Sequence, residues 1–128
     1  MIRKSQQGVM LLEALVAILI FTIGIIAVMG MQAVSISQVS QAKYRTDASY
    51  LANQITGRMW VDQANLASYA TAGAAGRAAW DAVVAQTLPA GVGVIAVNGR
   101  SVTVTIQWVQ PNENIPRKYV AVANINPS

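Results

Sequence analysis

The stretch that decides the fold is residues 9–31, which read VMLLEALVAILIFTIGIIAVMGM. At ~1.5 Å per residue a helix of this length reaches ~35 Å, enough to cross a hydrocarbon core of ~30 Å with some tilt. Its one charged residue is Glu13. An acidic side chain at the centre of a membrane helix costs roughly 2.5–3.5 kcal/mol, and although the cost is smaller near a helix end, the carboxylate still needs an explanation.

A short polar leader, residues 1–8, precedes this stretch; it carries Arg3 and Lys4 and ends in Gly8. The first charge after the apolar stretch is Lys43, so the positive-inside rule leaves the N-terminus in the cytoplasm and sends the rest of the chain across the membrane. Three interpretations stay open: a plain single-pass anchor, a cleavable signal peptide, and a leader processed at Gly8. A signal peptide would have a shorter apolar region and a small-x-small cleavage site, and no such site closes this one cleanly.

The composition excludes several functions. The 128 residues include no Cys and no His, so Cys–His and Ser–His catalysis are absent and a zinc site would need carboxylates alone. Without the leader the net charge falls from +4 to +2, because seven basic and five acidic residues remain, and these are too scattered for nucleic-acid binding. We expect no metal, no cofactor and no enzyme, since the acids outside the apolar stretch lack acid–base spacing: Asp47, Asp62, Asp81 and Glu113.

The helical pattern continues beyond the membrane-length stretch, and one helix is predicted from about Val9 to Leu66. Its second half is amphipathic, with one apolar face made of Ala48, Leu51, Ala52, Ile55, Met59 and Leu66. Gly24 and Gly30 are places where the helix could bend or be packed closely, or they are ordinary membrane-helix glycines.

The rest of the chain predicts a loop at residues 69–76, a short helix at 77–88, and three strands at 92–97, 100–109 and 118–126. Asn98-Gly99 is a strong hairpin signal, and a two-residue turn there would pair Val97 with Arg100, Ile95 with Val102 and Gly93 with Val104. One face of the hairpin should then pack on the amphipathic helix; it carries Ile95, Val97, Val102, Val104, Ile106 and Trp108.

We therefore predict an α+β fold, in which a long N-terminal helix packs on a small antiparallel sheet of about three strands. The expected organisation is a leader (1–8), a transmembrane half of the helix (9–31), an amphipathic half (32–68) and a small C-terminal domain (69–128). Trp60, Trp80 and Trp108 suit either a binding site or the core, and core packing is the simpler interpretation because a small domain needs large buried side chains.

A basic leader ending in Gly, an apolar helix with Glu at its fifth position, and a helix-on-sheet domain resemble the type IV pilins and pseudopilins. The residues that carry the match are Gly8, followed by Val9-Met10-Leu11-Leu12-Glu13-Ala14-Leu15-Val16. Three further stretches resemble PilV-type minor pilins: LANQI (51–55) with Arg58-Met59, Trp80 with LPAG (88–91), and VTVTIQW (102–108).

The resemblance implies that a prepilin peptidase cuts between Gly8 and Val9 and methylates the new N-terminus at Val9. It implies a minor pilin of the inner membrane with a periplasmic C-terminal domain, which joins other minor pilins and the assembly platform to prime an extracellular pilus. Val9 departs from the usual first residue, Phe or Met, but cleavage depends mainly on the Gly. A minor pseudopilin of type II secretion is the alternative; a tip adhesin and a membrane-tethered enzyme are further candidates.

In that family setting Glu13 pairs with the ammonium that cleavage creates at Val9, in its own chain or in a neighbour. Pairing offsets part of the cost of holding both charges in a low dielectric. The simpler alternative is a carboxylate near a helix N-terminus that is favoured by the helix dipole and reaches for the interface. Under that alternative Gly8 has no role.

Overall fold

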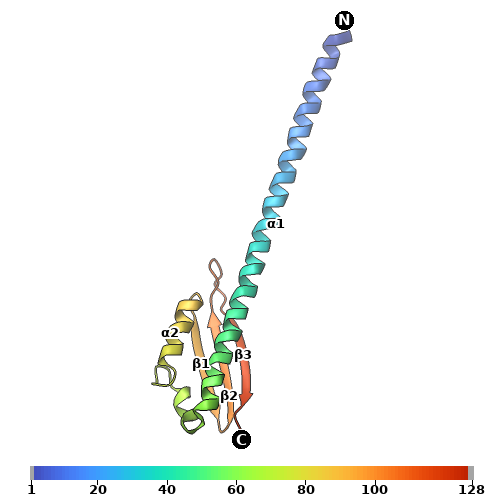
Figure 1. Cartoon of the computed structure of the whole chain (residues 1–128). Coiled ribbons are helices and arrows are strands. Elements are labelled where there is room, and N and C mark those ends of the chain that lie inside the picture. Colours follow the sequence, from blue (N-terminus) through green and yellow to red (C-terminus); the bar gives the residue numbers. More distant parts are fainter. Residues whose placement is uncertain (1, 127–128) are drawn as a thin grey trace. The chain divides into compact units, whose positions relative to one another are not determined.

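The computed structural model describes residues 2–126, and the side chains of residues 6–126. Three helices precede three strands: α1 (Ile2–Val61), the 3₁₀ helix η1 (Gln63–Ala70), α2 (Ala78–Thr87), β1 (Val92–Asn98), β2 (Ser101–Trp108) and β3 (Arg117–Asn124) (Figure 1). The strands form one antiparallel sheet in the order β1-β2-β3. The predicted α+β fold, with a long apolar N-terminal helix and a small three-stranded sheet, is confirmed.

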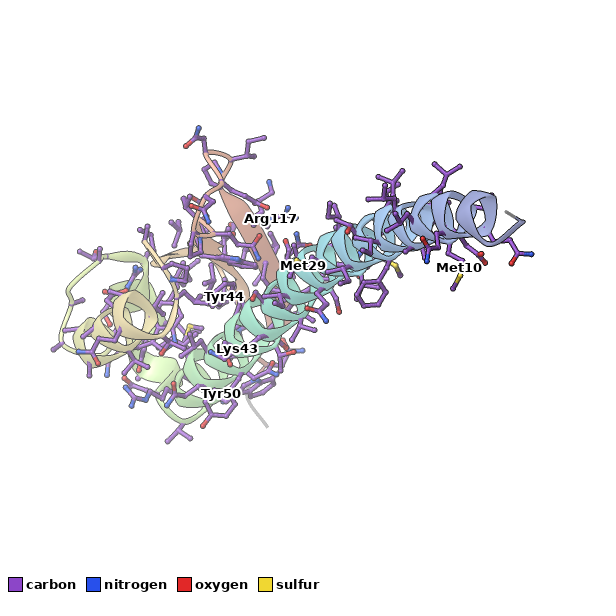
Figure 2. The ribbon with its side chains drawn as sticks, turned by 90° about the horizontal axis from the view of Figure 1, so that it is seen from above. Met10, Met29, Lys43, Tyr44, Tyr50 and Arg117 are labelled. Atoms are coloured by element: carbon purple, nitrogen blue, oxygen red, sulfur yellow. The ribbon has the colours of Figure 1, made fainter. Side chains whose placement is uncertain are left out.

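The chain divides into two compact units, Met1–Ser40 and Gln41–Ser128. The first unit is helical, and its apolar side chains are exposed; Figure 2 shows Met10 and Met29 projecting from it. Its most apolar window has a mean hydropathy of 2.8 and is not buried at all. Because one helix is long and apolar enough to cross a membrane, this unit is compatible with a single-pass membrane anchor.

The long helix ends at Val61, earlier than the predicted Leu66. Asp62 leaves helical geometry (φ −110°, ψ 48°), and its carboxylate accepts hydrogen bonds from Asn65 Nδ2 at 2.7 Å and from the Tyr69 hydroxyl at 3.0 Å. Asp and Asn side chains compete in this way with the helical backbone, which favours turns over continued helix. Leu66 therefore reaches the core from η1, where it is half-buried.

The core of the second unit lies between α1 and one face of the sheet. Residues 48, 51, 52, 55 and 59 of α1 are all buried, as the amphipathic pattern predicts. They pack with Ile95 of β1 and with the four alternate residues 102, 104, 106 and 108 of β2. The sheet face that the sequence assigned to the core is thus the buried one, with Val97 only partly covered.

The register of the hairpin differs from the prediction by two residues. The structure pairs Val97 with Val102, Ile95 with Val104 and Gly93 with Ile106, so the turn residues are Gly99 and Arg100. Gly99 has φ +62°, while Asn98 and Arg100 keep negative φ, which is the pattern of a type II′ turn with glycine first. A shift of two residues preserves every side chain's face, which is why the predicted core face was still right.

Helix α2 is held to the sheet by Trp80. Its indole nitrogen donates to the Leu51 carbonyl at 2.8 Å, and its ring lies directly over Gly93 of β1. A Cβ at residue 93 would overlap the ring atoms, so glycine at this position is required by the close approach of the tryptophan.

Candidate functional site

Gly8, Val9 and Glu13 all lie within α1. Glu13 comes four residues after Val9, so the two residues share one face of the helix about 6 Å apart along the axis. Val9 is 63% exposed, and nothing approaches within 4 Å of the position a Cβ would take at Gly8. The side chains of Arg3 and Lys4 lie outside the described residues, so their place around this segment is not defined.

The surroundings of Glu13 are apolar and exposed. Met10, Leu12 and Val16 flank it on the same part of the helix, and the ion pairs among the described residues do not include it. The segment therefore presents one carboxylate on an otherwise apolar surface that needs either lipid or other helices around it.

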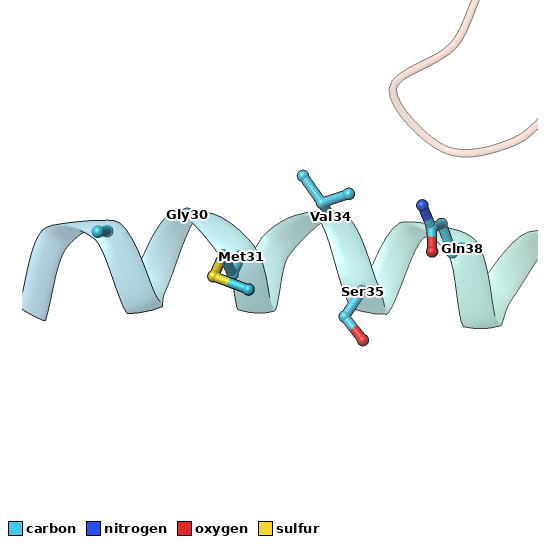
Figure 3. A pocket seen from close by; sticks show the side chains of 6 residues that line it. Gly30, Met31, Val34, Ser35 and Gln38 are labelled. Carbon is cyan, nitrogen blue, oxygen red and sulfur yellow. The ribbon is translucent and has the colours of Figure 1, made fainter.

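Two shallow grooves mark the helix where glycine replaces a side chain. One lies beside Gly30 and is lined by Ala27, Gly30, Met31, Val34, Ser35 and Gln38, as Figure 3 shows. The other lies beside Gly24, between Phe21 and Val28. The helix continues through both glycines, and among the described residues nothing lies within 4 Å of the position a Cβ would take at either one.

The acids of the second unit are engaged in local contacts. Asp47 pairs with Lys43 at 3.6 Å, and Glu113 accepts from the Arg117 Nε at 3.0 Å. Among the described residues no group of three or more potential metal ligands occurs. The acids thus stabilise neighbouring residues, and they do not converge on a common point.

Asp62 and Tyr69 form a part-buried contact. Burial, followed by the hydrogen bond to Asp62 and the negative charge of that carboxylate, raises the pKa of Tyr69 above its ordinary value. The phenol therefore stays protonated at neutral pH and acts as a donor that ties η1 to the end of α1.

Arg77 is the buried charge that sequence inspection missed. Its guanidinium is 2% exposed and donates to both oxygens of Asp81 at 3.1 Å, to the Tyr69 carbonyl at 2.8 Å and to the Gly93 carbonyl at 2.8 Å. The Arg77–Asp81 spacing of four residues on a helix was a visible signal of an ion pair, but the two carbonyls come from distant elements. Arg77 therefore links η1, α2 and β1, a structural role.

The three tryptophans separate into two groups. Trp80 and Trp108 are buried in the core, as predicted, whereas the prediction of core packing is wrong for Trp60, which is 43% exposed on α1. The indole nitrogen of Trp108 has no hydrogen-bond partner among the described residues. No converging polar groups accompany it, so the tryptophans do not outline a ligand site.

A shallow groove of about 480 Å³ lies between η1 and the hairpin turn. Alanines from η1 form much of its wall, and Gln63, Val97, Gly99 and Arg100 complete it. It offers one charged side chain and little depth, so the segment around Gly8, Val9 and Glu13 remains the stronger candidate for function.

Comparisons with protein-family models, with curated proteins and with solved structures give no match for this chain. Its function is therefore inferred from its own residues and their geometry.

Proposed function

We propose that this chain is a PilV-like minor type IV pilin, processed at Gly8–Val9 and held in the inner membrane until it joins a priming complex. The observation that carries the proposal is the placement of Val9 and Glu13 on one face of an exposed apolar helix, directly after Gly8. The small helix-on-sheet domain is of the kind such a chain needs as its periplasmic part.

Cleavage would create the positive charge with which the Glu13 carboxylate can pair. The cut converts the Val9 amide into an ammonium, about one helical turn from a carboxylate in the same apolar surface. Each charge alone is costly in lipid, and a pair is less so, particularly when the partner charge comes from an adjacent subunit that also covers the apolar surface. The pair would then set the axial register of neighbouring helices as they leave the bilayer.

The position of Gly8 also suits proteolysis. Residues 2–8 belong to α1, so a peptidase must open the first turns to reach an extended peptide bond. Glycine in a helix is ~1 kcal/mol less favourable than alanine, and the ends of helices fray. Local opening at Gly8 is therefore the least costly place to expose the chain near the start of the apolar stretch.

The first test is mass spectrometry of the N-terminus of the full chain, produced with a prepilin peptidase and recovered from membranes and sheared filaments. We expect a mature chain that starts at N-methyl-Val9. Gly8→Phe should abolish processing, whereas Gly30→Phe, the matched change inside the helix, should leave it intact. An unprocessed wild-type chain, or normal processing of Gly8→Phe, would contradict the proposal.

The second test concerns Glu13. Glu13→Val should insert and be processed normally but co-purify with other minor pilins about tenfold less, the effect of losing ~1.4 kcal/mol. Asp47→Asn, which removes a carboxylate outside the apolar stretch, should have no such effect. Normal co-assembly of Glu13→Val would refute the pairing role, and co-purification with secretion-system pseudopilins instead would favour the alternative assembly.

A further inference from the structure

The two edges of the sheet are not equivalent. The outer edge of β1 is partly covered, because η1 and α2 lie against this strand and the Gly93 carbonyl accepts from Arg77 Nη2 at 2.8 Å. In Figure 1, β3 forms the other edge of the sheet, away from α2. β3 is eight residues long and pairs with β2 without interruption from Ser101–Asn124 to Trp108–Arg117.

One hydrogen bond just beyond β3 shows which backbone groups of this strand are not bonded to β2. The Ile125 amide donates to the Arg100 carbonyl at 2.8 Å, in register with the β2–β3 pairing. Hydrogen-bonded pairs alternate along an antiparallel ladder, so the odd-numbered residues 117–123 bond to β2. The N–H and C=O groups of Lys118, Val120, Val122 and Asn124 therefore point away from the sheet, and among the described residues none of them has a hydrogen-bond partner.

The side chains of these same four residues lie on the outer face of the sheet. Val120 is 48% and Val122 70% exposed, and across the sheet Val92 and Val94 are also exposed. Lys118 stands at one end of this apolar row without an ion-pair partner among the described residues. The open edge therefore combines unpaired backbone groups, two exposed valines and one cation.

Natural sheets usually protect such an edge with proline, a bulge or several charges, and β3 has no proline, no bulge and one outward-facing lysine. We propose that the outer edge of β3 binds a fourth strand supplied by a different protein: an extended, alternately apolar segment with a carboxylate beside Lys118. Strand addition would satisfy the outward backbone groups and cover Val120 and Val122 together.

Charge argues against a second copy of β3 as the occupant. The strand carries Arg117 and Lys118 and no acid, and the charge of Arg117 is already matched by Glu113. In a two-fold pair of copies the β3 strands would run antiparallel, and because neither strand carries an acid, both lysines would stay uncompensated, whereas a partner strand with Glu or Asp supplies the missing charge. This inference does not depend on the proposed pilin role, because it rests on the sheet alone.

The test uses the full chain in detergent micelles and a capped peptide of alternating valine and threonine with one glutamate at the end that meets Lys118. Amide hydrogen exchange, read residue by residue by NMR, should show new protection at residues 118, 120, 122 and 124. The odd-numbered amides between them, already bonded to β2, should not change. A matching peptide with lysine in place of glutamate should bind about threefold more weakly.

Two variants at one position isolate the backbone contribution. Val120→Pro removes only an outward N–H, so the β2 ladder survives, and it should weaken peptide binding about tenfold or more. Val120→Thr keeps the N–H and should bind within about twofold of wild type. Circular dichroism tests whether both variants fold. Lys118→Glu is an independent variant, and it should reverse the preference between the glutamate peptide and the lysine peptide.

Three outcomes would overturn the proposal. The first is no protection at millimolar peptide, and the second is protection at β1 instead of β3. The third is protection of the even-numbered amides that rises with protein concentration in the absence of peptide, which would make a second copy the occupant.

Discussion

At the scale of single residues, the C-terminal domain depends on a few polar side chains placed deep among apolar ones. Arg77 is the clearest case, since its guanidinium reaches Asp81 and two backbone carbonyls, Tyr69 and Gly93, while almost fully buried. A buried charge is tolerated only when its hydrogen bonds are made, and here they are. The chain offers a built-in comparison, because Arg117 and Glu113 form the same kind of pair, four residues apart, at the surface.

Arg77→Leu should lower the free energy of unfolding by about 2–4 kcal/mol, because it leaves the carbonyls of Tyr69 and Gly93 without a donor and Asp81 without its cation. Arg117→Leu, the matched control, should change stability by less than about 1 kcal/mol, since exposed ion pairs contribute little. Urea titration of both variants measures the difference. Equal losses of unfolding free energy would show that the buried contacts of Arg77 stabilise the domain no more than the exposed pair of Arg117 does.

At the scale of elements, the hairpin shows how a turn selects among registers that share one face. Either Asn98-Gly99 or Gly99-Arg100 could occupy the two turn positions without moving a side chain from the core to solvent. The structure uses Gly99-Arg100, which needs a positive φ at one residue only, and glycine adopts that φ without strain. A turn at Asn98-Gly99 of type I′ would need positive φ at both residues.

The two registers predict different sensitivities at the turn. Gly99→Ala should lower the free energy of unfolding by about 1–2 kcal/mol, because an alanine Cβ is strained at φ +62°. Asn98→Ala should cost less than about 0.5 kcal/mol, because Asn98 is an exposed strand residue with negative φ. Thermal melts followed by circular dichroism measure both; a larger loss for Asn98→Ala would favour the Asn98-Gly99 turn.

At the scale of the whole molecule, the two units differ in where their apolar side chains lie. The first unit exposes its apolar side chains on every side, so it needs lipid or other helices. The second unit has its own core, and every buried residue of that core lies between Ala48 and Ile125. Each unit can therefore be stabilised by different means.

Removal of residues 1–40 should therefore leave a soluble domain that unfolds in one cooperative transition and keeps the near-ultraviolet signal of its buried tryptophans. Within it, Leu51→Ala should cost about 2–5 kcal/mol, the range for truncating a buried leucine. Tyr50→Ala, on the exposed side of the same helix, is the control and should cost far less. A shortened chain without a cooperative transition would show that the domain needs the preceding residues to fold.

Much of this architecture could be predicted from periodicity. The α1 core positions Leu51, Ile55 and Met59 follow from helical spacing, and the strand faces follow from alternation between Val102 and Trp108. The end of α1 at Val61 could not be predicted, because it depends on Asp62 accepting hydrogen bonds from residues further along the chain. The spacing of Gly8, Val9 and Glu13 in the candidate site is visible in the sequence. The open edge of β3 is not, because it depends on the order of the strands in the sheet.

The sequence by itself determined the apolar helix, the place of Glu13 within it, the helix-then-sheet order and the buried faces of the long helix and of the hairpin. These are local properties, set by spacing of 3.6 or 2 residues and by charge along the chain. Only the tertiary structure decided the register of the hairpin, the contacts of Arg77 and the difference between the partly covered edge of β1 and the open edge of β3. Those features depend on which distant backbone groups come within hydrogen-bonding distance, and packing alone sets that distance.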